Sequence, residues 1–111
     1  MKLVAGLGNP GREYEDTPHN VGFQVVDLLI EHLGISGFQS KFRSKICGAS
    51  ISGESCLFIK PQTYMNKSGE AVAEFVNFYK IPLEKIVIIS DDIDLPPGKV
   101  RFRDEGGHGG H

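Results

Sequence analysis

The run IVIIS at residues 86–90 restricts the fold of this chain more than any other stretch. Its first four residues are all apolar, which is typical of a strand that is covered on both faces of a sheet. Stretches with helical spacing of apolar residues alternate with such strand-like stretches along the chain. This alternation predicts an α/β layer fold with a mixed sheet.

The expected elements follow from where apolar residues recur. Strands are predicted where short apolar or alternating runs are bounded by turn residues, at 2–8, 45–51, 55–60, 85–90 and 99–103. Helices are predicted at 18–33 and 68–79, with Ser68 as the N-cap of the second. The apolar faces expected to be buried are Val21, Val25, Leu28 and Leu29 in the first helix, and Val72, Phe75, Val76 and Tyr79 in the second.

Length and composition are those of an ordinary globular protein. The chain has 111 residues, of which 40% are apolar and 23% charged, and this is enough for one packed domain. We therefore expect a single α/β domain over residues 1–111, with helices flanking a mixed sheet. No stretch approaches the roughly 18 apolar residues of a transmembrane helix, so we expect no membrane association and a cytoplasmic location.

The stretch GLGNPG at residues 6–11 matches the pattern G-x-G-x-x-G directly after a predicted strand. A dinucleotide site also needs a helix that begins at the loop and an acidic residue at the end of the next strand. Here the loop continues with polar residues to Pro18, and the acidic candidates Asp27 and Glu31 lie inside the predicted helix. The pattern therefore argues against a nucleotide cofactor, and the glycines must have another purpose.

The net charge of −2 gives the chain no overall attraction to nucleic acid. Basic residues nevertheless alternate along two segments, and on strands this spacing would place each trio on one face. The trios are Lys41, Arg43, Lys45 and Lys99, Arg101, Arg103. Such a stripe either contacts phosphates locally or is the solvated face of a strand, and the spacing does not decide between the two.

Cys47 and Cys56 lie in a predicted hairpin whose turn is at residues 52–54. In the expected registers Cys47 is opposite residue 59 or 60, and Cys56 is opposite residue 50 or 51. The two thiols would not face each other, so we expect no disulfide. Two reduced, buried thiols fit a reducing compartment.

Polar residues follow the predicted strands at the edge where open α/β sheets bind ligands. Asn9, Asn66 and Asp91 come after strands, and His19 lies in the first turn of the first helix. A neutral imidazole can take a proton from water while a carboxylate on its other nitrogen fixes the tautomer. No activated serine or cysteine is evident, so water is the expected nucleophile. The alternative is that His19 is an ordinary first-turn residue with a local hydrogen bond.

Other residues suggest metal binding or stacking. The run DDID at 91–94 invites a magnesium site, but adjacent carboxylates diverge on an extended chain. His108 and His111 lack the further ligands that zinc needs, so we expect no metal. Tyr14 and Tyr64 lie in the loops beside the expected crevice, where they would either stack on a base or pack onto the core.

Three long stretches together resemble the bacterial peptidyl-tRNA hydrolase family along the whole of residues 1–111. They are GLGNPGREYEDTPHNVGF, KPQTYMNKSGEAV and SDDIDLPPGKVRFRDEGGHGGH. The resemblance implies a three-layer α/β/α fold and a cytosolic esterase that hydrolyses peptidyl-tRNA and recycles the tRNA. It also implies a monomer that uses no metal or other cofactor and needs no obligate protein partner.

The resemblance implies roles for individual residues. His19 would be the general base, and Asp91 would hold it in its basic form. Asn9 would help to distinguish N-blocked from free aminoacyl-tRNA. The remaining contacts with the substrate would come from Tyr14, Tyr64 and Asn66, and the rim of the crevice would include Met65 and His111.

The chain departs from the family pattern in length. Family members continue beyond GGHGGH with further strands, a lid segment and a C-terminal helix, so we expect this chain to be the N-terminal part of the family's domain. Whether this part is active by itself is left open by the sequence. The alternative interpretation is a non-catalytic RNA-binding relative or an inactive fragment of the same fold.

Overall fold

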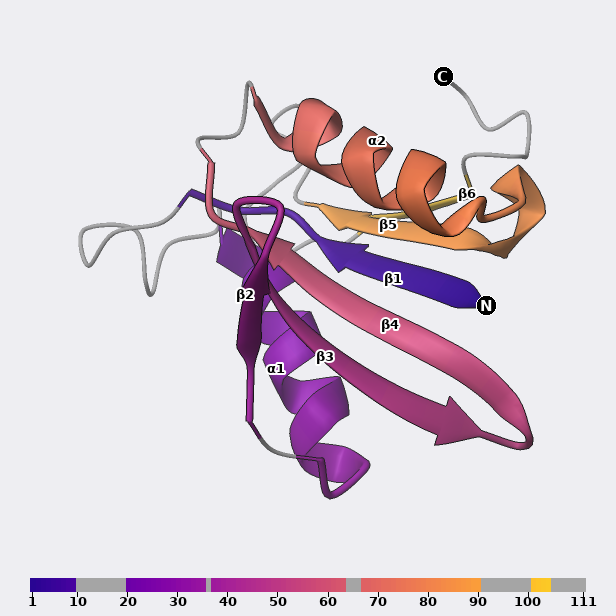
Figure 1. Ribbon diagram of the computed structural model, residues 1–111. Coiled ribbons are helices and arrows are strands. Elements are labelled where there is room, and N and C mark those ends of the chain that lie inside the picture. Colours follow the sequence, from indigo (N-terminus) through magenta and orange to yellow (C-terminus); the bar gives the residue numbers. More distant parts are fainter. Residues whose placement is uncertain (10–19, 36, 64–66, 91–100, 105–111) are drawn as a thin grey trace.

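The structure is a mixed sheet with one helix on each face. This computed structural model describes residues 1–9, 20–35, 37–63 and 67–90, and the backbone of residues 101–104. The six strands lie in the order β2-β3-β4-β1-β5-β6, with α1 and α2 on opposite sides (Figure 1). β1 is parallel to both β4 and β5, whereas the other neighbouring strands are antiparallel. The predicted α/β fold with a mixed sheet is thus confirmed.

The elements lie close to their predicted positions, and one short strand was not predicted. The helices are α1 (Val21–His32), α2 (Ser68–Tyr79) and a 3-10 helix, η4 (Leu83–Lys85). The strands are β1 (Lys2–Gly6), β2 (Gln39–Lys41), β3 (Ser44–Ile51), β4 (Glu54–Pro61), β5 (Ile86–Ser90) and β6 (Arg101–Asp104). The additional strand is β2, whose three residues Gln-Ser-Lys carry no apolar alternation.

The core has two halves because successive side chains of a strand point to opposite faces of the sheet. On one face, α2 covers the central strands with Leu3, Ala5, Leu57, Ile59, Val72, Phe75, Ile81, Ile86 and Ile88. On the other face, Val26 and Ile30 of α1 pack with strand residues. These are Cys47, Cys56, Phe58 and Ile89. The strand IVIIS contributes to both halves, as its apolar run predicts.

The buried face of α2 is the predicted one. Val72 and Phe75 are buried, and Val76 and Tyr79 pack against them at the edge of the core. The predicted N-cap is wrong by one residue: Ser68 is the first helical residue, and Lys67 precedes it as the cap. The Ser68 side chain is therefore buried under the helix instead of capping it.

The buried face of α1 differs from the prediction. Gly22, Val26 and Ile30 face the sheet, whereas Leu28 is 64% exposed. The cause is Gly22, because a Cβ atom at this position would lie 2.3 Å from the carbonyl oxygen of Leu7. Glycine lets the helix approach the sheet along this side, and a pattern based on apolar side chains does not detect it.

The predicted register of the β3–β4 hairpin is wrong by one residue. Cys47 pairs with Phe58 and Cys56 with Ala49, because the turn contains only two residues, Ser52 and Gly53. Both have positive φ, 51° and 83°, as a two-residue hairpin turn requires. The conclusion drawn from the register is nevertheless confirmed, since both cysteines are buried and free.

The first basic trio does not form a stripe. Arg43 lies with Phe42 in the tight turn between β2 and β3, where both have positive φ. The Lys41 ammonium donates a hydrogen bond to the Tyr79 hydroxyl at 2.9 Å, and Arg43 forms an ion pair with Glu74. Two of the three cations are thus held by α2. Lys99 and the side chains of Arg101 and Arg103 lie outside the described part of the chain.

Both α1 and α2 contain 12 residues. Among the described residues, no helix is long and apolar enough to cross a membrane.

Candidate functional site

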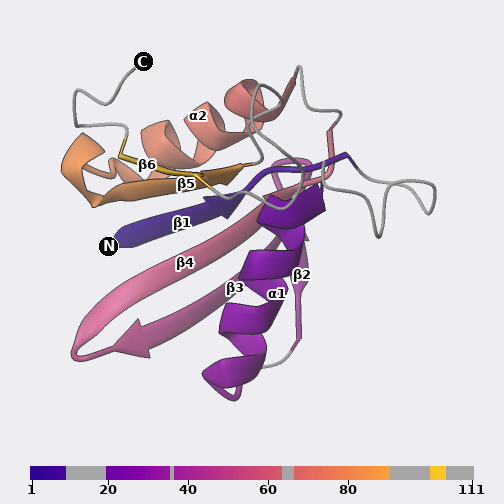
Figure 2. The ribbon, with the colours of Figure 1, turned by 180° about the vertical axis from the view of Figure 1, so that it is seen from behind.

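The carboxyl ends of β4, β1 and β5 lie at one edge of the sheet, because the three strands are parallel. Their arrowheads point the same way in both views (Figures 1 and 2). Beyond the end of β1 the chain stays in contact with β5, since the Leu7 N–H donates to the Ile89 carbonyl at 2.9 Å. The sequence analysis expects the site at this edge, which we call the carboxyl edge.

The structure describes one of the predicted site residues, Asn9, which is partly buried just beyond the end of β1. The others lie outside the described residues: Tyr14, His19, Tyr64, Met65, Asn66, Asp91 and His111. Four of these residues have an immediate sequence neighbour that is described. Asn20 follows His19, Ser90 precedes Asp91, and residues 63 and 67 enclose the stretch 64–66. The roles of the predicted residues therefore stay predictions, which these neighbours help to evaluate.

Asn9 is anchored by Asn20, a residue that the sequence analysis did not single out. The backbone N–H of Asn9 donates to the side-chain oxygen Oδ1 of Asn20 at 2.8 Å, and Asn20 is only 4% exposed. Asn20 is the N-cap of α1, yet its side chain makes no capping hydrogen bond within that helix. An asparagine at a helix start is usually interpreted as a cap. The partner in this case is eleven residues earlier, so local sequence did not reveal it.

The glycines of the N-terminal loop serve a close contact between β1 and α1. A Cβ atom at Gly6 would lie 2.3 Å from the carbonyl oxygen of Gly22. One at Gly8 would lie 2.8 Å from Asn20 Oδ1 and 3.0 Å from the ring of Phe23. Only residues without a side chain fit at these two positions. This contact brings the chain that carries Asn9 against the first turn of α1.

Two residues with buried hydroxyl groups flank the stretch 64–66 in the sequence. Thr63 Oγ1 and Ser68 Oγ have no hydrogen-bond partner among the described residues. The chain before them is fixed, because the Gln62 N–H donates to the carbonyl of Arg43 at 2.7 Å and its side chain donates to the carbonyl of Lys60. The described chain that precedes Tyr64 and Asn66 is thus held by hydrogen bonds of Gln62.

An ion pair connects the end of β4 to α1. The Lys60 ammonium donates to Asp27 Oδ1 at 2.6 Å and lies 4.4 Å from the centre of the Phe38 ring. The Lys60 side chain is 11% exposed, whereas that of Asp27 is 51% exposed. This pair helps to fix two elements that lead to the carboxyl edge.

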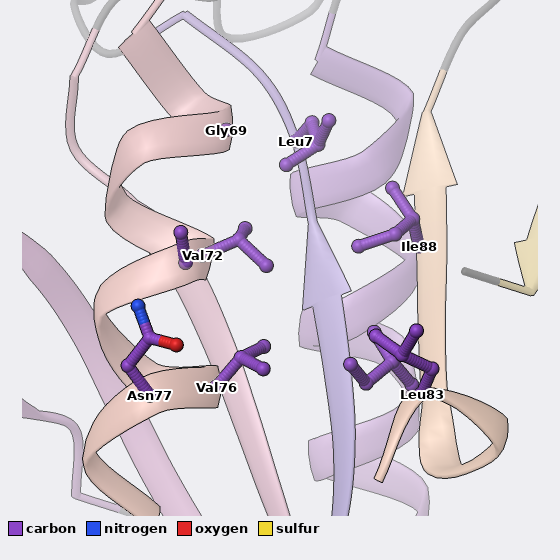
Figure 3. A pocket seen from close by; sticks show the side chains of 9 residues that line it. Leu7, Gly69, Val72, Val76, Asn77, Leu83 and Ile88 are labelled. Carbon is purple, nitrogen blue, oxygen red and sulfur yellow. The ribbon is translucent and has the colours of Figure 1, made fainter. Parts of the chain in front are cut away.

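An apolar groove lies beside the candidate site on the α2 face of the sheet (Figure 3). It has a volume of about 270 Å³ and is open to solvent between α2 and β5. Its lining includes Leu7, Gly69, Val72, Val76, Leu83 and Ile88. Because the lining residues have no ionisable side chain, the groove itself offers no acid–base chemistry.

Among the described charged groups with perturbed pKa values, Arg43 lies beside the end of β4, where its hydrogen bond to Glu74 raises its pKa, whereas Glu54 and Lys85 lie away from the carboxyl edge. Lys85 donates to the Glu54 carboxylate and so lowers the pKa of Glu54, and in return the pKa of Lys85 is raised. Glu54 begins β4 and Lys85 precedes β5, so this pair lies at the opposite edge of the sheet. Within the described residues, no group of three or more acidic, histidine or cysteine side chains is arranged to hold a metal ion.

Comparisons with known proteins agree with the fold. The family model for peptidyl-tRNA hydrolase matches residues 3–111. The chain is 54% identical to a peptidyl-tRNA hydrolase of Thermoanaerobacter sp. (strain X514) and 47% identical to one of Bartonella quintana, over all 111 residues in each case. A crystal structure of peptidyl-tRNA hydrolase from Acinetobacter baumannii superposes with a TM-score of 0.83 at 42% identity, covering 100% of this chain and 57% of that one. The chain spans about 60% of the length of its relatives.

Proposed function

Because the chain belongs to the peptidyl-tRNA hydrolase family, we propose that it hydrolyses the ester bond between peptide and tRNA in peptidyl-tRNA. This reaction returns tRNA to translation. The observation that carries the proposal is the family match over residues 3–111, a range that includes every predicted site residue. The common carboxyl edge of β4, β1 and β5 also supports the proposal. The chain segments that carry the predicted site residues before position 92 begin where these strands end.

In the proposed mechanism His19 is the general base. Its neutral imidazole takes a proton from water, and the water oxygen bonds to the ester carbonyl carbon. The tetrahedral intermediate then expels the 3′ oxygen of the ribose, which receives that proton from the imidazolium. The products are a peptide with a free carboxyl group and a tRNA with a free 3′ hydroxyl. Asp91 accepts a hydrogen bond from the second ring nitrogen, fixes the tautomer and stabilises the imidazolium.

Two hydrogen bonds support the pairing of His19 with Asp91. The chain that leaves β1 bonds to the carbonyl of Ile89, two positions before Asp91. Two residues after Leu7, the backbone N–H of Asn9 donates a hydrogen bond to the side chain of Asn20, which is one position after His19. The proposed base and its carboxylate partner are thus close in sequence to residues that both contact the segment 7–9, Ile89 through its backbone carbonyl and Asn20 through its side chain.

The substrate contacts in this proposal come from amides and aromatic rings. Asn9 reads the peptide carbonyl next to the ester, a group that free aminoacyl-tRNA lacks. Asn66 and backbone N–H groups stabilise the oxyanion. Tyr14 and Tyr64 stack on the end of the tRNA. The mechanism needs no metal or cofactor, and we propose that the protein acts as a cytoplasmic monomer.

The experiment that tests this function is hydrolysis of diacetyl-lysyl-tRNA by the wild-type chain and by His19→Ala. Loss of a general base lowers the rate by about 10²–10⁴, so we expect turnover to fall by that factor while tRNA affinity stays the same. Equal losses of affinity and turnover would contradict the role assigned to His19. No hydrolysis by the wild type would contradict the function.

A second candidate is a chain of the same fold that binds RNA without hydrolysing it. The chain spans about 60% of the length of its relatives, so their hydrolase activity is a proposal for it and binding without hydrolysis is the alternative to test. On this hypothesis the wild type binds tRNA, and its hydrolysis rate equals that of His19→Ala. A version extended with the C-terminal segment of a relative, assayed in parallel, identifies whether that segment supplies the activity.

A further inference from the structure

We infer that Asn20 is a positioning residue that holds Asn9 in place and thereby sets the preference for N-blocked over free aminoacyl-tRNA. The inference rests on the proposed function, since it concerns how the substrate is selected. Asn20 itself is not expected to touch the reacting atoms. Its effect on the reaction passes through Asn9.

The first observation is how the Asn20 side chain is used. Its Oδ1 accepts the backbone N–H of Asn9 at 2.8 Å and makes no capping hydrogen bond in α1. Capping the helix is the usual contribution of asparagine at this position. Here the buried acceptor is directed to the loop instead. Its hydrogen bond fixes the backbone of the residue that is proposed to read the peptide.

The second observation is that the anchor is rigid. Asn20 is 4% exposed, and Oδ1 lies against the backbone of Gly8, where an added Cβ would approach it to 2.8 Å. The helix that begins after Asn20 is itself seated against the sheet through Gly22. The position of the Asn9 backbone is therefore fixed by its contact with α1, which is itself packed against the sheet.

Such a support matters for selectivity more than for binding of tRNA as a whole. A site built to hydrogen-bond one substrate group discriminates strongly against a substrate that lacks the group. This discrimination requires the amide of Asn9 to stay within a fraction of an ångström of its position. If the anchor is lost, hydrolysis of the N-blocked substrate should fall, whereas that of the free aminoacyl-tRNA, which lacks the group, should change little.

Two substitutions separate this effect from helix capping. Asn20→Ser keeps a good N-cap residue, but its hydroxyl is one bond shorter and does not reach Asn9. Asn20→Asp keeps an oxygen acceptor at the same distance, replaces the amide donor with a second oxygen and adds a negative charge when the carboxyl group is ionised. Both substrates meet the same charge, so the blocked-to-free ratio, and not either rate alone, is the readout. We compare kcat and KM for N-acetyl-lysyl-tRNA and lysyl-tRNA, after urea unfolding has shown that each variant is folded.

A displacement of about 1 Å can cost 10²-fold in rate, so we expect the blocked-to-free ratio of kcat/KM to fall about 10- to 100-fold in Asn20→Ser. In Asn20→Asp the ratio should stay close to that of the wild type. A fall of the same size in both variants, or in neither, would overturn the inference. The hydrogen-exchange rate of the Asn9 N–H in the wild type gives a test that needs no variant: exchange as fast as in an unfolded peptide would also overturn it.

Failure of the inference can be distinguished from failure of the proposed function. If the wild type does not hydrolyse N-acetyl-lysyl-tRNA, the proposed function is contradicted whatever Asn20 does. Selectivity is then measured as the affinity ratio of two amide-linked analogues, N-acetyl-lysyl and lysyl 3′-amino-3′-deoxyadenosine. A ratio that collapses in Asn20→Ser and survives in Asn20→Asp still supports the anchor, and an unchanged ratio rejects it.

Discussion

Replacing Gly22 with alanine is expected to destabilise this protein, although the same change inside an ordinary helix is stabilising. The Cβ of alanine would lie 2.3 Å from the carbonyl oxygen of Leu7, 2.5 Å from the Leu7 nitrogen and 2.5 Å from the carbonyl oxygen of Ile89. All three atoms belong to the backbone of the sheet. No side chain can rotate away to make room, so α1 itself has to move outward.

The geometry gives the size of the effect. An ordinary contact at this point needs about 3.4 Å, so the helix must withdraw by about 1 Å from β1 and β5. That movement also loosens Val26 and Ile30 in the core on this face. Overpacking of a core costs about 1–3 kcal/mol and occasionally more. Because rigid backbone is involved, we place the cost near 3 kcal/mol, from which the helical preference of alanine subtracts about 1 kcal/mol.

The assay is urea unfolding followed by circular dichroism, with Gly69→Ala as the matched control. Gly69 lies in the first turn of α2, and no heavy atom lies within 4 Å of a Cβ built there. We expect Gly22→Ala to lower the free energy of unfolding by about 2 kcal/mol, with a fall in Tm of about 8–16 °C. Gly69→Ala should raise the stability by about 0.5 kcal/mol.

The refuting result is a Gly22→Ala protein with the stability of the wild type or higher. It would mean that the backbone of α1 does not lie directly against Leu7 and Ile89. The explanation of the glycine pattern, and of the rotated face of α1, would fail with it.

Two further predictions concern stability. Phe75→Ala should cost about 3–5 kcal/mol because this ring is fully buried, whereas Phe78→Ala, at a side chain 59% exposed, should cost much less, and equal costs in urea unfolding would contradict the packing. Lys85 lowers the pKa of Glu54, so the ionised carboxylate stabilises the fold above its ordinary pKa of 4.5 and this contribution disappears as the pH falls through the lowered pKa. Glu54→Gln should thus be less stable than the wild type at pH 7 and equally stable at about pH 2; a difference that does not change with pH would count against the pair.

The sequence was sufficient for elements whose partners are set by side-chain pattern. The apolar run at 86–90 predicted a strand covered on both faces, and the spacing of Val72 and Phe75 predicted the buried side of α2. The pattern of apolar side chains did not predict the buried face of a helix where a backbone contact determines that face. At Gly22 the backbone of α1 lies directly against the sheet, because this residue has no side chain. The face of α1 that meets the sheet therefore differs from the face that its leucines indicate.

The errors in the hairpin region came from the turns. A two-residue turn at Ser52 and Gly53 shifted the hairpin register, and a similar turn at Phe42 and Arg43 separates Lys41 from Lys45, so the first basic trio does not lie along one strand. Positive φ at non-glycine residues is uncommon, so the sequence alone gave little reason to expect the turn at Phe42 and Arg43, or that the predicted turn after Ile51 has only two residues. The short strand β2 has no alternation of apolar residues, so the sequence pattern did not predict it.

For the site, motifs in the sequence predict the reacting residues, and the topology shows that the carboxyl ends of distant strands meet at one edge. Parallel pairing of β1 with β4 and β5 brings the three strand ends to one edge, as expected for an open α/β sheet. Asn20 was missed because its partner is Asn9, which lies on a separate element. The roles of His19 and Asp91 stay predictions.

The most direct test of the account is a double-mutant cycle on His19 and Asp91, measured as kcat/KM for N-acetyl-lysyl-tRNA. Residues that act as one catalytic unit have strongly non-additive effects. We therefore predict that the double variant His19→Ala, Asp91→Ala is about as slow as His19→Ala alone. Losses that multiply, as for two distant and independent sites, would contradict the proposal that the imidazole and the carboxylate work together.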